Sequence, residues 1–492
     1  DNSFQKLSEM SSDIGIYGLT SQGIQLALNF ASKGYLVTVG NKSSDKIKEC
    51  IELAEKSDLE EKIRGIKDVG DFCKNLKTPR RILLLARPGS SVDRNMQKIL
   101  PLLEAGDVII DGGCDSISEC DRRCKEVEEK GFQYMTMAIM GTDSDMHTGP
   151  AFLASGSKAV YDLVEPMLNK VAAEANHHAC AGYIGKGSAA VFIKSLCNAL
   201  EIGESQLLAE MYDLMRQMRL SNNEMSDTFA EWNKRDQSSY LLQITSTIVG
   251  KKDTDVEGCK PSDNFLVERI WDQAPQKKSG VDVMGESATV HASSSVMDSA
   301  IFARYATCSR EQRVKVNGLV KGPKFDWSHV DLQTVLKDME DAYACARIVL
   351  YAQAFAMLTA ASSTYQWEVN RSEVARVLTA GNLLRCKLLE QIAEALDSDS
   401  PAENLLLNET FLKLLMMKQN AWRRILSLGV MAGVTAPTGM AALAYFDGMR
   451  TERLPGALVQ CLRDCLKEEG FERIDKKGEI FSCRWTDRKS VV

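Results

Sequence analysis

The sequence lacks the cysteine and histidine patterns that bind structural metals. Its fourteen cysteines are scattered, no pair of CxxC motifs occurs, and only five histidines are present. Cys120 and Cys124 lie one helical turn apart, yet no histidine is near them in sequence. Zinc sites draw on such clusters, so no metal site is predicted. Unpaired thiols indicate the cytoplasm or another reducing intracellular compartment, although a targeting segment could have been removed before Asp1.

The sequence also lacks long basic runs, and its net charge is −7 at pH 7. This balance gives no reason to expect nucleic acid or an anionic membrane as the main partner. One stretch, residues 425–446, carries no charge over 22 positions, which is long enough for a membrane helix. Pro437 and its small neighbours would break such a helix in the middle. We therefore predict two buried helices joined by a tight turn, and no membrane insertion.

What is present is the composition of a soluble globular protein with room for two or three domains, since 44% of the 492 residues are hydrophobic and 26% are charged. Strand patterns occur up to about residue 187. Helical periodicity dominates afterwards, for example over residues 189–218, 331–363 and 371–396. The predicted fold is an α/β Rossmann-type domain over residues 1–187, followed by a large all-helical domain.

The first ninth of the chain predicts a dinucleotide-binding βαβ unit. Residues 13–17 form a short apolar strand, a turn with Gly18, Thr20 and Gly23 follows, and an amphipathic helix leads to a second strand at residues 35–39. Glycines in such a turn let backbone N–H groups approach a pyrophosphate at the positive end of the helix. Thr20 stands where the GxGxxG pattern has its second glycine, and a small side chain there is usable but less accommodating.

The end of the second strand decides between NAD and NADP. No acidic residue for a ribose 2′-hydroxyl occurs there, and the chain reads Asn41-Lys42-Ser43 instead. A cation beside amide and hydroxyl groups suits a 2′-phosphate, so NADP is the predicted cofactor, and the alternative is a lysine in a solvated loop. The later strands at residues 81–85 and 108–111 end in turns at the sheet edge where ligands bind.

One helix of the second domain carries candidate chemistry. Lys194, Asn198 and Glu201 lie at positions i, i+4 and i+7, which places them on one helix face among apolar neighbours. A lysine and a carboxylate on a largely buried face can have displaced pKa values, as a general base and a general acid require. The alternative is a salt-bridged polar stripe without catalytic function.

Several blocks of the chain resemble the 6-phosphogluconate dehydrogenase family, in one order and at the right separations over nearly the whole length. The blocks are residues 18–23, 41–43, 108–113, 192–201, 232–234, 301–304 and 445–464. The resemblance implies that residues 188–451 form a helical dimerisation and substrate domain. It also implies that residues 452–492 form a C-terminal tail, which reaches into the partner subunit of a homodimer.

The resemblance implies an oxidative decarboxylation in the pentose phosphate pathway. In the family the lysine matching Lys194 takes the proton from the C3 hydroxyl of 6-phosphogluconate while hydride passes to NADP. Carbon dioxide leaves, and the glutamate matching Glu201 protonates the enediol to give ribulose 5-phosphate, without a metal. The implied catalytic residues are Lys194, Glu201 and Asn198; the implied NADP contacts are Gly18, Thr20, Gly23, Asn41, Lys42, Ser43 and Arg87; and the implied contacts of the phosphorylated sugar acid are Gly141, Lys277, Ser279, Arg304 and Arg463.

Several sugar-binding positions depart from the family pattern. The family has asparagine, a Ser-Gly-Gly turn, histidine, tyrosine and a tail histidine at the places taken here by Cys114, residues 140–142, Cys197, Ile202 and Glu469. Apolar or bulkier side chains therefore replace groups that would bind the sugar hydroxyls, carboxylate and phosphate. An unpaired hydroxyl costs about 1–3 kcal/mol, so efficient turnover of 6-phosphogluconate is not expected.

Three hypotheses follow for the function. The first is a degenerate paralogue with a structural or regulatory role, which could extend to a place in a larger assembly. The second is an active NADP-dependent 6-phosphogluconate dehydrogenase with a divergent pocket, favoured by the retained Lys194, Asn198 and Glu201. The third is an oxidoreductase for another phosphorylated hydroxy acid, favoured by the retained phosphate-binding cations.

Overall fold

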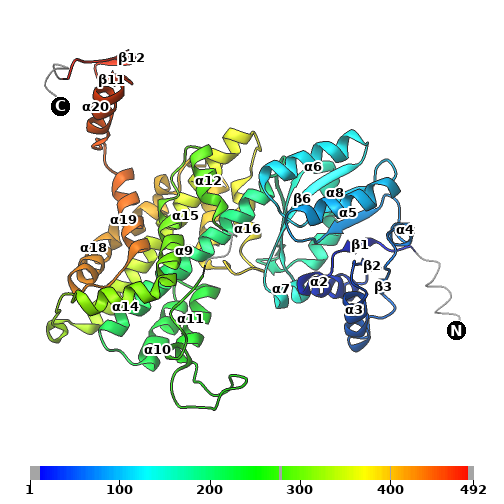
Figure 1. The fold of residues 1–492 in the computed structure, drawn as a ribbon, viewed down its shortest axis with the longest axis horizontal. Coiled ribbons are helices and arrows are strands. Elements are labelled where there is room, and N and C mark those ends of the chain that lie inside the picture. The colour runs from blue at the N-terminus through cyan, green and yellow to red at the C-terminus, as the bar shows by residue number, and fades with distance from the viewer. Residues whose placement is uncertain (1–10, 276–279, 399–400, 486–492) are drawn as a thin grey trace. The chain divides into compact units, whose positions relative to one another are not determined.

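The computed structural model describes residues 11–275, 280–398 and 401–485. By internal contacts the chain divides into a large unit up to Ala441 and a smaller unit from Ala442 onward. The large unit begins with an α/β part, drawn in blue to cyan in Figure 1, and continues with a helical part. The predicted fold class is confirmed by this order of elements.

The α/β part is built on an eight-stranded sheet in the order β10-β7-β6-β5-β4-β1-β2-β3. From β6 to β3 neighbouring strands are parallel, while β7 runs antiparallel to β6 and parallel to β10. The strands are β1 Ile14–Tyr17, β2 Val37–Gly40, β3 Ile63–Gly65, β4 Arg81–Leu84, β5 Val108–Asp111, β6 Gln133–Met140, β7 Ala151–Gly156 and β10 Ala181–Gly185. The direction in which successive strands are added to the sheet reverses between β1 and β4. Sheets of this kind bind ligands at the carboxyl edge of the strands at that point.

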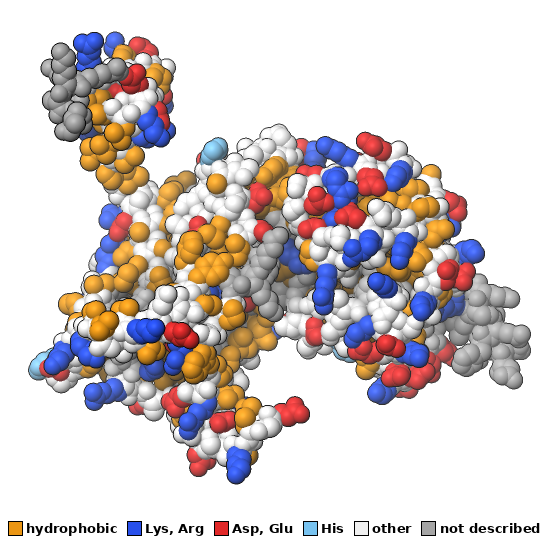
Figure 2. Space-filling view, viewed as in Figure 1, with side chains coloured by type: hydrophobic (Ala, Val, Ile, Leu, Met, Phe, Trp, Pro, Cys, Tyr) orange, Lys and Arg blue, Asp and Glu red, His pale blue; other side chains and the backbone are white. Residues whose placement is uncertain are grey.

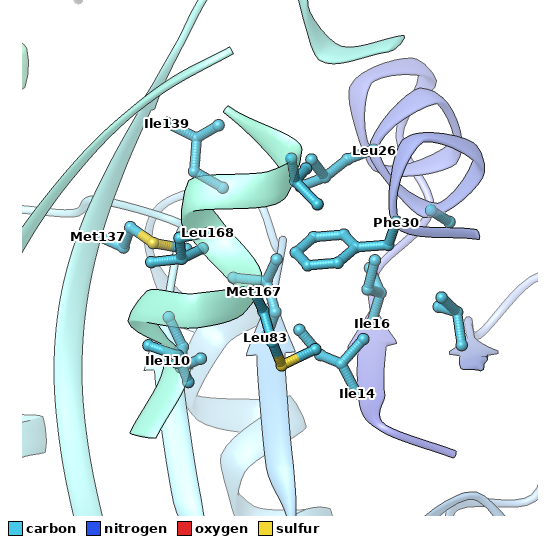
Figure 3. Close-up of a cluster of buried hydrophobic side chains, with 14 of the residues drawn as sticks. Ile14, Ile16, Leu26, Phe30, Leu83, Ile110, Met137, Ile139, Met167 and Leu168 are labelled. Atoms are coloured by element: carbon cyan, nitrogen blue, oxygen red, sulfur yellow. The ribbon is translucent and has the colours of Figure 1, made fainter. Parts of the chain in front are cut away.

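Helices cover both faces of this sheet and bury two apolar clusters. The helices are α2 Ser21–Ser32, α3 Ser44–Lys56, α4 Val69–Lys74, α5 Ser90–Ile99, α6 Ile117–Glu129, α7 Asp143–Thr148 and α8 Lys158–Val171. Figure 3 shows Leu26 and Phe30 of α2, with Met167 and Leu168 of α8, turned toward the strand side chains of one cluster. Phe72 of α4 and Val92 of α5 belong to the second cluster. These buried faces fix the strand ends that carry the predicted turns.

The helical part follows from Ala189. Its helices are α9 Ala189–Gln217, α10 Asn222–Asn233, α11 Tyr240–Gly250, α12 Asp282–Thr289, α13 Ser295–Cys308, α14 Arg310–Leu319, α15 Leu332–Tyr365, α16 Arg371–Val377, α17 Lys387–Leu396, α18 Glu409–Ala432 and the start of α19 Pro437–Met449. Of the helices in the described residues, α15 alone is long and apolar enough to cross a membrane, and 83% of its most apolar window is buried inside the protein. That burial is typical of a core helix.

The predicted periodic stretch at residues 371–396 is interrupted, because α16 ends at Val377 and α17 begins at Lys387. Gly381 adopts a φ of +67°, and a side chain there would lie 2.7 Å from the carbonyl oxygen of Gly149. The buried Asn382 holds the connection by donating its amide N–H groups to the carbonyl oxygens of Leu378 and Ala380. Close contact with the α/β part therefore breaks a pattern that looks continuous in sequence.

Residues 425–446 form the ends of two helices joined by a turn, as predicted. Burial was predicted for both, but Val430 and Met431 are 60% and 56% exposed, so α18 is buried on one face only. The start of α19 is fixed by Glu210 of α9, whose carboxylate accepts hydrogen bonds from the N–H groups of Thr438 at 2.8 Å and Gly439 at 2.9 Å. A carboxylate at this position also complements the helix dipole.

The smaller unit contains α20 Gly456–Lys467 and a hairpin of β11 Phe471–Arg473 with β12 Lys476–Phe481. Asp464 of α20 organises the unit, because its carboxylate accepts hydrogen bonds from Gly470 N, Cys483 N and the indole N–H of Trp485. The hairpin departs from the sequence prediction, which found almost no strand signal after residue 187. Its strands are short and mostly exposed, so they lack the alternation by which strands are recognised.

Candidate functional site

A pocket of about 390 Å³ lies where the carboxyl edge of the sheet meets α9. Its lining comes from the β1–α2 turn, the β4–α5 and β5–α6 loops, β6, α2, α7, α9 and α12. It includes Thr20, Arg87, Cys114, Lys194 and Asn198. The predicted cofactor turn and two of the three predicted catalytic residues therefore share one cavity. The pocket lies at the place that the strand order designates for a ligand.

The β1–α2 turn has the geometry that a dinucleotide pyrophosphate needs. Gly18 adopts a φ of +111°, and a side chain there would lie 2.6 Å from the carbonyl oxygen of Leu85. A side chain on Gly23 would lie 2.7 Å from the carbonyl oxygen of Gly18. The Thr20 hydroxyl caps α2 by accepting the N–H of Gly23 at 3.2 Å, and the first turn of α2 carries no acidic residue. These residues fit an anionic dinucleotide at the positive helix end.

Asn41, Lys42 and Ser43 directly follow β2, at the strand end where the cofactor ribose was predicted to bind. Asn41 is half-buried, while Lys42 and Ser43 are exposed directly after the strand. Ser43 is the N-cap position of α3, although its side chain makes no cap hydrogen bond. A lysine ammonium, a serine hydroxyl and the positive end of α3 thus coincide at the strand end, a combination that suits a phosphate group.

Lys194 and Cys114 are neighbours in the pocket. The Lys194 ammonium acts on the Cys114 thiol through its charge and a side-chain hydrogen bond, which opposes the rise that burial causes in the pKa of the thiol. Cys114 also donates to the carbonyl oxygen of Met137 at 3.4 Å. Its φ of +49° is a left-handed conformation that asparagine tolerates better than cysteine does. Cys114 is therefore an altered position in direct contact with the predicted general base.

Glu201 lies two helical turns beyond Lys194 on α9, with Arg304 of α13 close by. Burial raises the pKa of the Glu201 carboxyl, and the positive charge of Arg304 opposes that rise. A carboxyl that keeps its proton to higher pH can act as a general acid. The long α9 helix thus presents a candidate base, an amide and a candidate acid in line.

Not every predicted substrate residue joins this group. Lys277 and Ser279 lie outside the described residues. Gly141 does not line the pocket; its φ is +136°, and its carbonyl oxygen accepts the Gln22 side-chain N–H at 3.4 Å. Arg463 belongs to the smaller unit, where it forms an ion pair with Glu469.

Some of the positions that differ from the family pattern line this pocket, and others lie outside its described lining. Cys114, Met140, Thr142 and Cys197 were predicted to leave few groups that hold a sugar chain, and among the four only Cys114 is part of the described lining of this pocket. Thr142 caps α7 in a capping box with Asp145, and Cys197 is 2% exposed. Ile202 packs with Ala300 and Ile301 in a small apolar cluster.

The sequence did not reveal the residues that connect the β4–α5 and β5–α6 loops beneath the pocket lining, which are Asp115 and Arg123. Asp115 lines the pocket and accepts the N–H of Gly89 at 2.6 Å. Arg123 of α6 is fully buried and contacts Asp115 and Asp93. A charged residue in an amphipathic helix is expected to face solvent, so the sequence gives little sign that Arg123 faces inward. The single available signal was an arginine on the apolar side of α6, next to Cys120 and Val127.

The fold and the pocket define a chain of the class that joins a dinucleotide-binding domain to a helical domain carrying acid–base residues. Residues 13–185 match the NAD binding domain of 6-phosphogluconate dehydrogenase, and residues 190–485 match the C-terminal domain of 6-phosphogluconate dehydrogenase. The chain therefore belongs to the 6-phosphogluconate dehydrogenase family, which confirms the resemblance noted in the sequence.

Individual relatives agree over almost the whole chain. The NADP(+)-dependent, decarboxylating 6-phosphogluconate dehydrogenase of Bacillus subtilis is 35% identical, covering 96% of this chain and 98% of that protein. The decarboxylating enzyme of Escherichia coli is also 35% identical, covering 96% of this chain and 99% of that protein. The solved structure of the Plasmodium falciparum 6-phosphogluconate dehydrogenase matches with a TM-score of 0.92 and 32% identity, covering 96% of this chain and all of that chain.

Proposed function

We propose that this chain binds NADP and keeps the acid–base chemistry of a decarboxylating 6-phosphogluconate dehydrogenase, but turns over 6-phosphogluconate far more slowly than its relatives. Retention of Lys194 and Asn198 in the pocket supports the chemistry. The observation that carries the expected loss of rate is Cys114, which puts a thiol beside Lys194 where the family has an amide. The site then holds the proton-transfer groups with fewer groups to orient a sugar chain.

In this proposal NADP supplies the acceptor for the hydride that leaves C3 of the substrate. Lys194 takes the proton of the C3 hydroxyl, so the alcohol becomes a ketone in the β position to the carboxylate. When the bond between C2 and the carboxylate carbon breaks and carbon dioxide leaves, the electron pair moves onto the C3 oxygen, and Lys194 returns the proton there to give an enediol. Glu201 gives its proton to the carbon of the resulting enediol. Burial of Glu201 supports the second role, because it raises the pKa of the carboxyl and so favours the protonated form that a general acid needs.

The proposal is tested by NADPH production from 6-phosphogluconate with purified full-length protein. We expect fewer than about one turnover per second, the lower range of ordinary enzymes. A rate at or above that value would contradict the proposal and make the chain a working dehydrogenase with a divergent pocket. The same assay with other phosphorylated hydroxy acids tests the third hypothesis, because a faster rate there would assign another substrate.

A catalytically inactive, structural or regulatory paralogue remains the second candidate. Two observations favour it. Ile202, which replaces the tyrosine of the family, packs in an apolar cluster. Glu469, which replaces the tail histidine of the family, forms an ion pair with Arg463. Both changes weaken a phosphate site. Absence of any NADPH production, together with intact NADP binding, would support this candidate.

We predict that NADP binds more tightly than NAD and that Lys42→Glu removes most of the difference. Reversing the charge beside a 2′-phosphate should weaken NADP binding roughly tenfold or more and leave NAD binding nearly unchanged. Dissociation constants from isothermal titration calorimetry measure both. Lys98→Glu, an equal charge change on the exposed side of α5, is the matched control. Equal affinity of the parent protein for the two cofactors would overturn the assignment.

We also predict a homodimer. Exposed apolar side chains gather over the helical part, as Figure 2 shows on one face, and they include Tyr305, Leu319 and Met417. In the smaller unit, α20 exposes Leu458, Leu462 and Leu466. Surfaces of this kind mark protein interfaces. Light scattering at low micromolar concentration should give about twice the 54.4 kDa monomer mass. A monomer at that concentration would rule the dimer out.

A further inference from the structure

The buried guanidinium of Arg123 joins two loops of the pocket. Its side chain has no exposed surface, and its Nε and Nη2 bind the two carboxylate oxygens of Asp93 at 3.0 Å and 3.1 Å. Nη2 also donates to Asp115 at 2.9 Å and to the carbonyl oxygen of Gly89 at 3.4 Å. Asp93 belongs to α5, Gly89 precedes α5, and Asp115 belongs to the β5–α6 loop.

The two loops are also tied to each other. The Asp115 carboxylate accepts the backbone N–H of Gly89 at 2.6 Å, on the same Oδ2 atom that Arg123 contacts. Residues 85–88 and 112–116 all line the pocket. Arg123 itself does not line it. A shift of this guanidinium would therefore move Arg87 and Cys114 without touching either directly.

The charges explain why the position demands an arginine. Asp111 lies in the same cluster, with Oδ2 at 3.9 Å from Nη1 of Arg123, and its other oxygen accepts the N–H of Gly113 at 2.8 Å. Removing one charge from such a buried group leaves the others uncompensated, whereas lysine keeps the charge but loses the planar fork that reaches two carboxylates together.

We propose that Arg123 is a positioning residue of the NADP site, which sets the β4–α5 and β5–α6 loops in the geometry that receives the dinucleotide. This inference rests on the proposed binding of NADP. It assigns to α6 the function of positioning the two loops through Arg123. Because the two loops lie away from the end of β2, Arg123 should act on NADP and NAD alike, unlike Lys42.

The test is isothermal titration of NADP and NAD into the full-length protein and its Arg123→Lys and Asp115→Asn variants, with circular dichroism to establish folding. We expect both dissociation constants to rise roughly tenfold in each variant, with the NADP-to-NAD ratio unchanged. The double variant should bind each dinucleotide no more weakly than the single variant with the higher dissociation constant, because the two residues act as one unit. Arg122→Lys is the matched control, since Arg122 shares Asp93 at 2.5 Å but is 46% exposed.

Each outcome decides one question. Failure of the parent protein to bind either dinucleotide refutes the proposed function, whatever the variants do. Tight binding by the parent, with folded variants that bind equally well, refutes the positioning role alone. If Arg123→Lys does not fold, the Asp115→Asn variant still decides, because it keeps the shape of the side chain and removes only its charge. Additive losses in the double variant would also overturn the proposal.

Discussion

Cys114→Asn is expected to raise kcat/KM for 6-phosphogluconate about 5- to 150-fold. Cysteine offers the substrate only a weak donor, and its thiol already donates to the carbonyl oxygen of Met137 at 3.4 Å. An asparagine amide adds two strong donors and an acceptor beside Lys194. Pairing one buried substrate hydroxyl is worth about 1–3 kcal/mol, which corresponds to that range of rates. Steady-state kinetics of NADPH formation measure the change.

The backbone at Cys114 should accept this substitution. Its φ of +49° lies in the left-handed region, where asparagine is several-fold enriched over most residues. The melting temperature should therefore stay the same or rise. Cys114→Ser is the matched control, because it restores a polar group of similar size without the left-handed preference, and it should recover less. If Cys114→Asn binds NADP normally but gains no activity, the defect does not lie at this position.

Restoring the other altered positions should help less, for reasons that differ from one position to the next. Ile202 lies so close to Gly280 that a side chain on Gly280 would meet the Ile202 Cδ1 at 2.8 Å. A tyrosine at position 202 is larger, and overpacking of this kind costs about 1–3 kcal/mol. Cys197 is buried outside the described lining of this pocket, so Cys197→His is expected to gain less activity than Cys114→Asn.

Arg347→Met is expected to lower the free energy of unfolding by about 3–5 kcal/mol. Arg347 of α15 is 1% exposed, and its Nε lies 3.2 Å from the fully buried carboxylate of Glu204 on α9. Tyr343 and Tyr351 also donate to this carboxylate, at 3.1 Å and 3.2 Å. Removal of the guanidinium leaves a buried negative charge with two neutral donors. The loss should loosen the contact between α9 and α15.

Thermal and denaturant unfolding followed by circular dichroism measure this effect. Arg424→Met is the surface control, since Arg424 is 60% exposed in its ion pair with Asp338 and its replacement should cost far less stability. The double variant Glu204→Gln with Arg347→Met should be less damaging than Arg347→Met alone, because no buried charge remains unpaired. A loss of equal size in the control and in Arg347→Met would show that burial of the pair is unimportant.

Much of the fold could be predicted from the sequence because it depends on local patterns. The apolar strand at residues 14–17, the glycines at positions 18 and 23 and the amphipathic helix after them are short-range features. Lys194, Asn198 and Glu201 lie on the single helix α9, and helical periodicity alone places i, i+4 and i+7 on one face.

What the tertiary structure alone decided is which distant residues meet. The sequence names Cys114, Met140, Thr142 and Cys197 as equal departures from the family. Packing places only Cys114 in the described pocket lining.

Arg123 resembles any surface arginine of an amphipathic helix until Asp93 and Asp115 surround it. The break between α16 and α17 likewise comes from the contact of Gly381 with Gly149. The sequence by itself determined the family, the order of elements and the helix face that carries the candidate chemistry. The pocket lining and the buried charge clusters follow from contacts between residues far apart in the chain, which no local pattern encodes.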